Sequence, residues 1–199
     1  MLPVITISRE AGSNGHKIGE LVAKELNIPI IDKFVIDDDK DNSGVSPYES
    51  ERKGQFLMQY DLFTNSKYYN GLDLEDDQSD MYHIQRKIIL EEAKKGPCVI
   101  IGRCADAILN EESIESLNVF IHADMDTRVK NIHEKYPETR TPIEKLLKRQ
   151  DTRRASYYSF NTEREWGAAE NYDLVLNSST LGEEFCADII VETARKMDR

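Results

Sequence analysis

Hydrophobic residues along this chain occur in two kinds of run. The short, continuous runs are rich in Val, Ile, Leu and Phe, which is typical of strands covered on both faces of a sheet. They predict strands at Val4–Ser8, Ile28–Ile31, Cys98–Ile101, Leu117–His122 and Tyr172–Leu176. The longer runs have helical spacing and predict helices at Gly15–Leu26, Met81–Lys95, Ala105–Leu109, Met125–Lys135, Ile143 to about Tyr158, and Gly182–Met197. Strands that alternate with helices form βαβ units, so the pattern predicts an α/β fold in which helices flank a parallel sheet of about five strands.

Several predicted helices have recognisable ends. Gly96-Pro97 is expected to end the helix before it, and Asp124 can cap the helix that follows it. Thr141-Pro142 places a proline at a first helical position. Thr180 and Glu183 have the spacing of a capping box, which predicts a helix start between them.

Residues 37–80 interrupt this alternation. The segment starts with the charged, turn-rich run Asp37–Gly44 and finishes with the acidic run Asp73–Asp80. Aromatic residues with partly helical spacing lie between these runs, namely Tyr48, Phe56, Tyr60, Phe63, Tyr68 and Tyr69. The spacing predicts a small helical insertion that closes over the carboxyl edge of the sheet. An acidic loop with one helix touching the core is the alternative.

The composition sets the class of protein. The 199 residues suffice for one α/β domain, and 39% hydrophobic with 32% charged residues are typical of a soluble, globular chain. No apolar run approaches the roughly 20 residues that span a bilayer, and the first residues lack the features of an export signal. Cys98, Cys104 and Cys186 have no metal-ligand spacing, so we expect free thiols in a reducing cytoplasm.

The formal net charge of −11 narrows the possible partners. A chain this acidic is repelled by nucleic acid and by anionic membrane surfaces, so we expect neither as a partner. A nucleotide is compatible with this charge, because a small phosphate pocket needs only a few local cations. The sequence does not indicate an oligomeric state.

The most informative stretch runs from Val4 to Gly19. A short apolar strand leads into a turn rich in Gly, Ser and Asn, and an amphipathic helix follows. Glycines let the backbone approach a phosphate, and the unpaired N–H groups and positive dipole end of the helix point toward it. This order predicts an anion-binding loop, with a plain strand–turn–helix connection as the alternative. The candidate phosphate-binding residues of the turn are Gly12, Ser13, Asn14, Gly15, His16 and Lys17.

The turn departs from the P-loop pattern G-x-x-x-x-G-K-[ST]. That pattern requires a lysine after its last glycine and then a hydroxyl that holds magnesium. Here His16 directly follows Gly15, Lys17 comes one place later, and neither Ser nor Thr follows. His16 is the histidine that we consider as a hydrogen-bond donor to phosphate, because it lies inside the turn.

Two other predicted strands end in residues that suit a ligand. The strand Cys98–Ile101 leads into Gly102-Arg103, which sets a guanidinium at the carboxyl edge, where open α/β sheets bind ligands. A planar guanidinium suits bidentate phosphate contacts, although an arginine that ties down a loop is the alternative. Asp32 ends another strand and can orient an acceptor hydroxyl or hold Mg²⁺ through water. A helix cap or a loop hydrogen bond is the alternative for Asp32.

The segment Lys148–Arg154 is a basic exception in an acidic chain. On a helix, Arg149 and Arg153 share a face, because they are four residues apart. Such a face can clamp a transferring phosphoryl group, whose charge spreads over its outer oxygens, whereas a solvated run of charges is the alternative. The following segment, Tyr157–Trp166, is rich in aromatic and polar residues and is expected to be a loop that folds shut.

Taken together, these residues resemble the cytidylate-kinase-like family, a branch of the P-loop nucleoside monophosphate kinases, over nearly the whole chain. Residues 5–10, followed by Gly12-Ser13-Asn14-Gly15 and Ile18-Gly19, look like the opening motif of that branch. Gly102-Arg103 resembles the Gly-Arg of true cytidylate kinases, in which the arginine meets the phosphate of the acceptor nucleotide. Further matches are Ile30–Lys33 at the acid-bearing second strand, Arg149, Asp151 and Arg153 or Arg154 on the arginine-bearing lid, and Asn171–Ser178 at the last core strand.

The resemblance implies a three-layer P-loop NTPase fold, with ATP and Mg²⁺ as the donor and a nucleoside monophosphate as the acceptor. A pyrimidine such as CMP or dCMP is expected. Residues 37–80 would be the acceptor-binding insertion of a single 1–199 domain, residues 149–166 the lid, and no residue is assigned to a metal. The implied catalytic residues are Arg103, Arg149, Arg153 and Arg154, and the implied acceptor-binding residues are Asp32 and Arg103.

The chain also departs from true cytidylate kinases. Gly15 stands about where their loop lysine would be, Arg9 stands where their first loop glycine is, and Ile101 and Cys104 replace acids that flank the Gly-Arg. We expect Arg9, Lys17 or a lid arginine to supply the missing charge. Two other functions stay open. The missing lysine and hydroxyl favour a nucleotide-binding protein without turnover, and the acidic insertion favours a kinase for a non-nucleotide acceptor.

Overall fold

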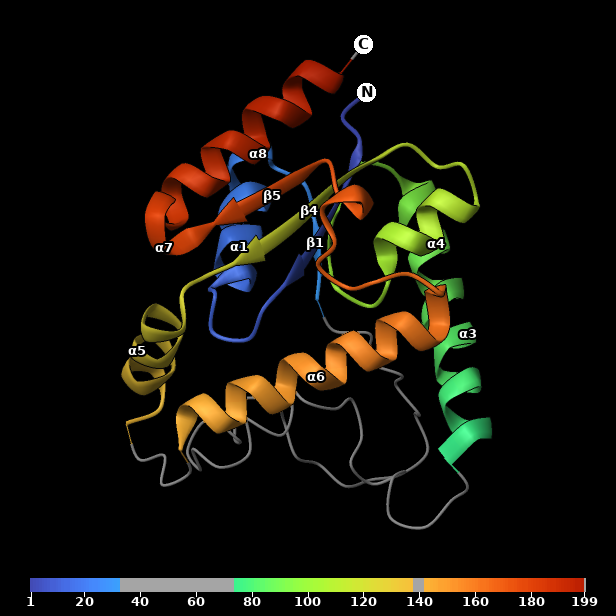
Figure 1. The fold of residues 1–199 in the computed structure, drawn as a ribbon. Coiled ribbons are helices and arrows are strands. Elements are labelled where there is room, and N and C mark those ends of the chain that lie inside the picture. The colour runs from blue at the N-terminus through green and yellow to red at the C-terminus, as the bar shows by residue number, and fades with distance from the viewer. Residues whose placement is uncertain (33–73, 138–141, 199) are drawn as a thin grey trace, which may run out of the picture.

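The computed structural model of the chain describes residues 1–32, 74–137 and 142–198. Most of the predicted insertion, 37–73, lies outside the described residues. The two ends of the chain lie near each other (Figure 1), and the N-terminal ammonium of Met1 is 2.5 Å from Oδ1 of Asp198.

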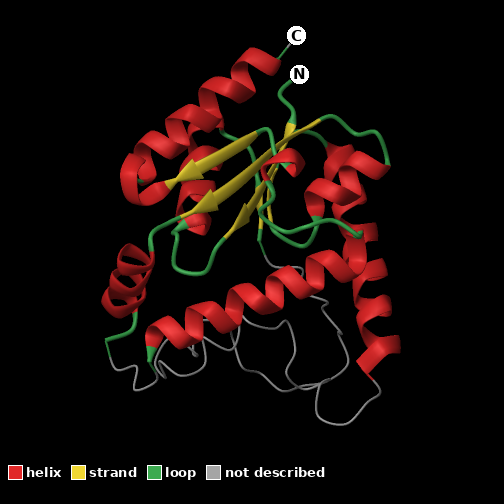
Figure 2. Cartoon of the chain, viewed as in Figure 1, coloured by secondary structure: helices red, strands yellow, loops and turns green. Residues whose placement is uncertain are grey.

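The strands form one sheet (Figures 1 and 2). They are β1 (Val4–Arg9), β2 (Ile30–Ile31), β3 (Val99–Ile101), β4 (Ser116–His122) and β5 (Leu174–Asn177), in the order β2-β3-β1-β4-β5. Every pairing is parallel, and β1 lies at the centre between β3 and β4. The prediction of a parallel five-stranded sheet flanked by helices is confirmed.

Helices cover both faces of the sheet. The helices are α1 (Gly15–Leu26), α3 (Leu74–Lys95), α4 (Ala105–Glu111), α5 (Met125–Lys135), α6 (Ile143–Thr162), α7 (Ser178–Leu181) and α8 (Glu183–Met197), with a short 3-10 turn at Ala169–Asn171. The helices α1 and α8 pack together on one face, and α3 and α4 lie on the other. Beyond the carboxyl edge of the strands, α5 and α6 pack against each other (Figure 1).

The core follows from the alternation of side chains along the strands. Successive residues of a strand point to opposite faces. Ile5 and Ile7 of β1 therefore pack with Val22 of α1 and Ile190 of α8, whereas Val4 packs with the cluster around α3 and α4. Ile5 and Ile7 are fully buried on one face and Val4 is 5% exposed on the other, so the central strand is packed on both faces.

Two helices extend further than the sequence suggested. Helix α3 begins at Leu74, so nearly all of the acidic run Asp73–Asp80 is helical. Helix α6 continues to Thr162, and the prediction of a loop from Tyr157 onward is wrong for residues 157–162. The reason is tertiary, because Tyr158 is buried and its hydroxyl donates a 2.6 Å hydrogen bond to Oδ2 of Asp106 on α4.

The helix ends agree with the sequence in part. Helix α3 ends at Lys95, directly before Gly96-Pro97, as predicted. Asp124 occupies the N-cap position of α5, although its side chain makes no capping hydrogen bond, and Pro142 occupies the N-cap rather than the first helical position of α6. The capping box at Thr180 is wrong. Thr180 lies inside the one-turn helix α7, because Oδ1 of Asn177 accepts from the N–H of Ser179 and starts that helix earlier.

Gly19 provides a test of how α1 packs on the sheet. A Cβ at Gly19 would lie 2.6 Å from Cδ1 of the buried Ile101, so the helix approaches β3 too closely for a side chain. We expect Gly19→Val to lower the free energy of unfolding by about 1–3 kcal/mol through overpacking, although valine forms helix better than glycine. Lys24→Val at an exposed position of the same helix is the control, with a change of about 0.5 kcal/mol or less. Urea denaturation measures both, and equal effects would contradict the close packing.

Candidate functional site

The carboxyl ends of the central strands meet the start of α1 and the middle of α6 at one edge of the sheet (Figure 1). The segment between β1 and α1, residues 9–15, lies at this edge and is called the β1–α1 loop below. It forms hydrogen bonds with residues of α5 and α6. This is the edge at which open α/β sheets bind ligands, so the loop is the natural starting point for the site.

The β1–α1 loop turns through two left-handed residues, Gly12 with φ 79° and Asn14 with φ 60°. A Cβ at Gly12 would lie 2.9 Å from the carbonyl oxygen of Arg128, so a glycine is required where the loop passes α5. Asn14 is the N-cap residue of α1, but its side chain does not cap the helix. It donates instead from Nδ2 to Oε1 of Glu183 at 2.5 Å, which leaves the first turn of α1 without a side-chain cap.

The backbone carbonyls of the loop are turned toward surrounding side chains. Four carbonyl oxygens accept hydrogen bonds from side chains of three helices, α5, α6 and α7. The pairs are Arg9 with Nη1 of Arg154 (2.9 Å), Ala11 with Nε of Arg128 (2.7 Å), Gly12 with Nδ2 of Asn131 (2.8 Å) and Ser13 with Oγ of Ser178 (2.8 Å). The carbonyl of Glu10 accepts from Oγ of Ser13 at 2.9 Å. The acceptors of the loop are therefore occupied by the protein itself.

Several amide groups of the loop have no hydrogen-bond acceptor among the described residues. Across a trans peptide, the carbonyl of one residue and the N–H of the next point in opposite directions. Turning the carbonyls of Ala11 and Ser13 outward therefore directs the N–H groups of Gly12 and Asn14 to the other side. Among the described residues, these two N–H groups and that of Gly15 donate no hydrogen bond. With the uncapped start of α1, they offer several donors and a positive dipole end to one anion.

Lys17, a candidate for the missing loop charge, is paired with a neighbouring carboxylate. Its Nζ forms an ion pair with Oε2 of Glu183 on α8, and this hydrogen bond raises the pKa of Lys17. The side chain of Lys17 is more than half exposed, and Asn14 contacts the same glutamate. The sequence suggested that Lys17 faces a phosphate in the loop. In the structure its ammonium group is paired with the carboxylate of Glu183.

Arg9 occupies the space above Gly15. A Cβ at Gly15 would lie 2.5 Å from Cβ and 2.9 Å from Cγ of Arg9, so the arginine fills the position in which a side chain at residue 15 would stand. At its far end, Nη1 of Arg9 lies against the backbone of Gly102, at the end of β3. The guanidinium thus lies between the β1–α1 loop and the Gly102-Arg103 turn.

His16 lies between two carboxylates. Its Nδ1 is 3.2 Å from Oδ2 of Asp32, and its Nε2 is 3.2 Å from Oε1 of Glu20. The hydrogen bond to Asp32 raises the pKa of His16 above its ordinary 6.5, while burial and the charge of Arg9 act against this rise. Only the imidazolium can donate from both ring nitrogens, so the two carboxylates together favour the charged form.

The turn after β3 has an unusual backbone. Gly102, Arg103 and Cys104 all have a positive φ, at 68°, 63° and 56°. Such a conformation costs free energy in residues other than glycine, of the order of 1 kcal/mol each, and collects at functional sites. The N–H of Gly102 donates to the carbonyl of Ile7 at 3.0 Å, so this turn is fixed to the end of β1. Arg103 therefore lies at the predicted edge, beside the loop.

Helix α6 brings part of the basic segment to the loop. Arg154 contacts the carbonyl of Arg9, and Oδ1 of Asp151 accepts the N–H of Ala11 at 2.8 Å. Arg149 and Arg153 are exposed on the same helix. Of the lid arginines predicted from the sequence, Arg154 thus contacts the loop, whereas Arg149 and Arg153 lie on the exposed surface of α6.

Sequence reasoning missed several of the residues that bind the carbonyl groups of the loop. Arg128 and Asn131 of α5 contact the carbonyls of Ala11 and Gly12, and the side chain of Arg128 is only 5% exposed. A signal existed, because the two residues are three apart on a predicted helix that follows a strand of the sheet. Ser178, which follows the last strand, offered no comparable pattern.

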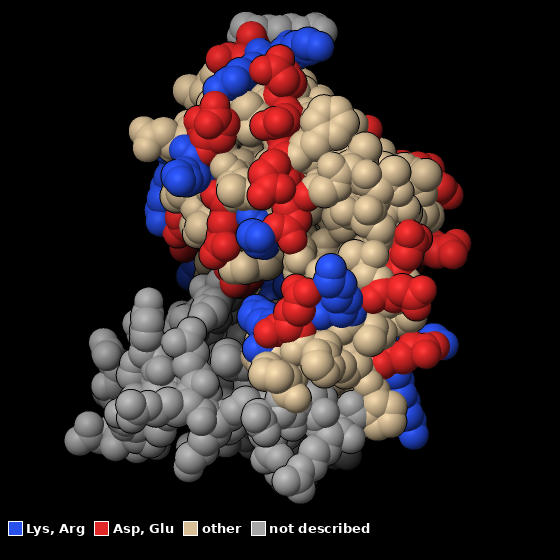
Figure 3. Space-filling model, turned by 90° about the vertical axis from the view of Figure 1, so that its left-hand side faces the viewer, with Lys and Arg blue, Asp and Glu red and all other residues tan. Residues whose placement is uncertain are grey.

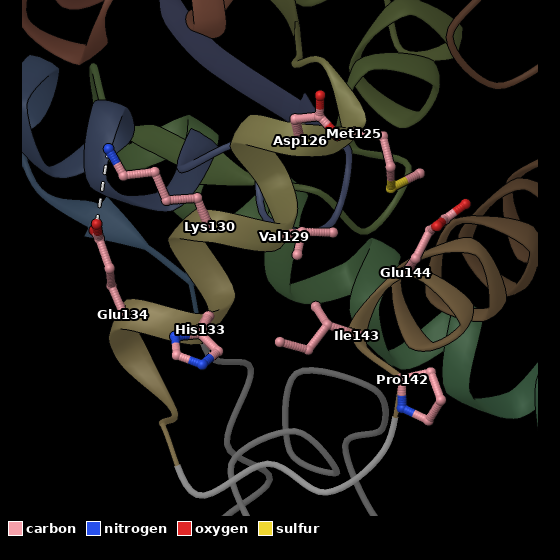
Figure 4. Close-up of a pocket in the computed structure, with 9 residues that line it drawn as sticks. All are labelled: Met125, Asp126, Val129, Lys130, His133, Glu134, Pro142, Ile143 and Glu144. Atoms are coloured by element: carbon pink, nitrogen blue, oxygen red, sulfur yellow. Dashed lines mark ion pairs between the residues drawn. The ribbon is translucent and has the colours of Figure 1, made fainter.

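A cavity of about 290 Å³ adjoins the loop. Its lining residues are Ser13, Asn14, Thr127, Asn131, Ser178, Gly182, Glu183 and Glu184. A larger cavity of about 670 Å³ lies between α5 and the start of α6 and is lined by Met125, Val129 and Ile143 with charged neighbours (Figure 4). The larger cavity has no lining residue from the β1–α1 loop, so the smaller one is the better candidate for part of the site.

A basic patch, a membrane-spanning helix or a metal cluster would each indicate a different kind of site. Acidic and basic side chains are mixed on the side of the molecule seen in Figure 3, without a continuous basic patch among the described residues. Residues 1–32, 74–137 and 142–198 contain no helix both long and apolar enough to cross a membrane. The same residues contain no cluster of three or more His, Cys, Asp or Glu arranged to hold a metal. Cys98, Cys104 and Cys186 are buried free thiols.

Solved structures similar to this chain share its fold. A protein from Eubacterium ventriosum, described as uncharacterized, is 24% identical with a TM-score of 0.70, and the match covers 99% of each chain. A gluconokinase from Sinorhizobium meliloti is 16% identical with a TM-score of 0.53, over 99% of this chain and 98% of that chain. A shikimate kinase from Bacteroides thetaiotaomicron is 14% identical with a TM-score of 0.51, over the same shares. The predicted P-loop kinase fold is confirmed.

Family models give a more specific match. A comparison with curated proteins finds no significant match. The model of the cytidylate kinase-like family, however, matches residues 4–180, from the start of β1 to the segment after β5. This match includes the β1–α1 loop, the Gly102-Arg103 turn and α6. The chain therefore belongs to the cytidylate kinase-like family.

Proposed function

We propose that this protein transfers a phosphoryl group from ATP, with Mg²⁺, to a small acceptor, with a nucleoside monophosphate such as CMP or dCMP as the first choice. The observation that carries the proposal is the β1–α1 loop, whose carbonyls are bound by the framework while the N–H groups of Gly12, Asn14 and Gly15 have no acceptor among the described residues. Membership of a kinase-like family supports it.

In this proposal, Arg9 takes the place of the loop lysine. Its side chain fills the space over Gly15, and its guanidinium lies between the donor loop and the Gly102-Arg103 turn. A cation in this position stabilises the charge that spreads over the transferring phosphoryl group. Lys17 is the weaker candidate, because its charge is paired with Glu183. The loop residues Gly12, Ser13, Asn14, Gly15 and His16 complete the donor site.

The cavity beside Ser13 and Asn14 is the proposed site for the nucleoside of the donor. It adjoins the loop, and the carboxylates of Glu183 and Glu184 and the side chains of Thr127 and Asn131 line it. Carboxylate oxygens accept hydrogen bonds from an exocyclic amino group such as that of adenine. A ligand held there places its phosphates against the start of α1.

The described residues fit a polyphosphate better than they fit a metal ion by itself. They contain no cluster of metal-ligating side chains. Mg²⁺ commonly binds through substrate phosphates and water with few protein ligands, so this site does not exclude it. When bound, the ion would neutralise charge on the donor phosphates.

The acceptor is proposed to bind on the β2 and β3 side of the loop. Arg103 would contact the phosphate of the acceptor, and Asp32, through its contact with His16, would orient the acceptor hydroxyls. Arg149, Arg153 and Arg154 of α6 would surround the transferring group as the 149–166 segment closes and excludes water. Catalysis would rest on positioning and electrostatic stabilisation.

Two other functions remain to be tested against this one. Phosphoryl transfer to a non-nucleotide acceptor is supported by two proteins with this fold that are described as a gluconokinase and a shikimate kinase. A nucleotide-binding role without turnover is favoured by the absence of a lysine at residue 15. Single-turnover transfer from labelled ATP to a panel of nucleoside monophosphates and neutral small alcohols separates all three.

Arg9→Ala tests the charge at the loop. We expect ATP-dependent phosphorylation of CMP by the wild type, with kcat reduced by about 10²-fold or more in Arg9→Ala because the transition-state charge loses its partner. Lys17→Ala is the matched control, and we expect its kcat to stay within about threefold of wild type, since a surface ion pair contributes little. A coupled assay for ADP release measures both. Loss of activity in Lys17→Ala with normal activity in Arg9→Ala would assign the charge to the lysine instead.

His16 gives a prediction about pH. Because its folded pKa is raised above 6.5, the imidazolium predominates below that folded pKa and is lost as the pH rises through it. ATP affinity is therefore expected to decrease over the same pH range. Asp32→Asn should lower the pKa of His16 more than Glu20→Gln does, because the hydrogen bond to Asp32 is the largest cause of the shift. NMR titration of the ring protons checks this order, and an unchanged pKa in Asp32→Asn would refute it.

A further inference from the structure

Arg128 is a buried cation that contacts two residues of the β1–α1 loop and one residue of α6. Its side chain is 5% exposed, and Nε donates to the carbonyl of Ala11 at 2.7 Å. Nη1 lies 3.2 Å from Oε2 of Glu10, and Nη2 pairs with Oδ2 of Asp151. A guanidinium has a rigid fork of donors, and a buried one needs partners in fixed directions. The acceptors are therefore held at set positions relative to α5.

Asp151 completes the arrangement from α6. While Oδ2 pairs with Arg128, Oδ1 accepts the N–H of Ala11 at 2.8 Å. Glu10 is held as well, because its Oε2 accepts the N–H of Ala123 at the end of β4 at 3.0 Å. The three side chains Glu10, Arg128 and Asp151 are called the loop clamp below.

The loop clamp holds Ala11 at both of its backbone groups. The N–H is bound by α6 and the carbonyl is bound by α5. With both groups held, the peptide between Ala11 and Gly12 has one orientation, and its N–H faces the side opposite to Arg128. Gly12 has no room to relax toward α5, since a Cβ there would meet the carbonyl of Arg128.

The loop clamp could influence phosphate binding through its charge or through the geometry that it gives the loop, and the sign of its charge distinguishes the two. Two carboxylates and one guanidinium carry a net charge of −1, which lies beside a loop that would bind an anion. This charge by itself opposes phosphate binding. A clamp that nevertheless favours binding does so by fixing the geometry of the loop.

We propose that Glu10, Arg128 and Asp151 are positioning residues that fix the Ala11–Gly12 peptide so that its N–H faces the donor phosphate. The inference rests on the proposed function, because it takes the loop ligand to be a polyphosphate. It adds residues that contact no phosphate themselves and act through the backbone of the loop. It also joins α6 to the donor site, so that displacement of α6 changes the affinity of the loop.

Asp151→Asn tests the clamp, because geometry and charge predict opposite results. The two donors point at different oxygens of Asp151, and an asparagine presents an NH₂ group in place of one of them, so one donor would face another donor. We expect the Kd for Mg²⁺–AMP-PNP, measured by calorimetry, to rise roughly tenfold to hundredfold, as when a hydrogen bond to a charged group is lost. If charge alone mattered, removal of one negative charge would tighten binding, and a Kd equal to or below that of wild type would overturn the proposal.

Glu144→Gln is the matched control. It removes the same charge from the same helix at an exposed ion pair with Lys148, and we expect an unchanged Kd. Arg128→Lys is the second variant. It keeps the charge, but its three donors sit on one nitrogen and cannot replace the planar fork that faces the Ala11 carbonyl, Glu10 and Asp151 from three separate nitrogens. It should therefore weaken binding without any change in net charge, and wild-type affinity in Arg128→Lys would also overturn the proposal. If Asp151→Asn does not fold, Glu10→Gln replaces it with the same expected weakening.

The wild type separates failure of the clamp from failure of the proposed function. If the wild type takes up no Mg²⁺–AMP-PNP, both the phosphate site and its clamp are refuted. If the wild type binds and the variants bind equally well, the donor site stands and only the clamp is refuted. Thermal unfolding of the ligand-free variants accompanies each titration, and weakening counts in favour only where the variant is folded at the temperature of the measurement.

Discussion

The site depends on how the backbone of the β1–α1 loop satisfies its own hydrogen bonds. A polar backbone group that is removed from water must find a partner, and in this loop the carbonyls find theirs in Arg154, Arg128, Asn131 and Ser178. The peptide planes are thereby fixed, and the amide groups on the other side are left for a ligand. The proposed anion site is thus a consequence of where the carbonyls are bound.

Charge has to be organised locally in a chain with a net charge of −11. The acids near the loop are largely committed to partners: Glu183 to Lys17 and Asn14, Asp151 to Arg128, and Asp32 to His16. Arg9 and Arg103 lie close to the edge where β1 and β3 end. A pocket for a small anion can form under these conditions because pairing removes most of the repulsion at short range.

More of the fold than of the candidate site could be predicted from the sequence. The runs Val4–Ser8 and Cys98–Ile101 predicted buried strands because a strand covered on both faces must be apolar at every position. The turn of residues 12–17 could be singled out as a candidate from adjacent residues alone, because glycines followed by an amphipathic helix form a local pattern. Tyr157–Thr162 was expected to be a loop because its aromatic and polar residues have no clear helical pattern. The buried contact of Tyr158 with Asp106 makes this segment helical, and that contact joins residues far apart in the chain.

The sequence by itself determined that strands and helices alternate, that β1 leads into a glycine-containing turn before a helix, and that arginines follow β3 and lie on α6. These follow from periodicity and from residues adjacent in the chain. Only the tertiary structure decided that Lys17 pairs with Glu183, that Arg9 lies over Gly15, and that the buried Arg128 holds Ala11. The direction of a long charged side chain depends on which groups the fold brings within contact distance. For Lys17 and Arg128 these groups are more than a hundred residues away in the chain and leave no pattern in the local sequence.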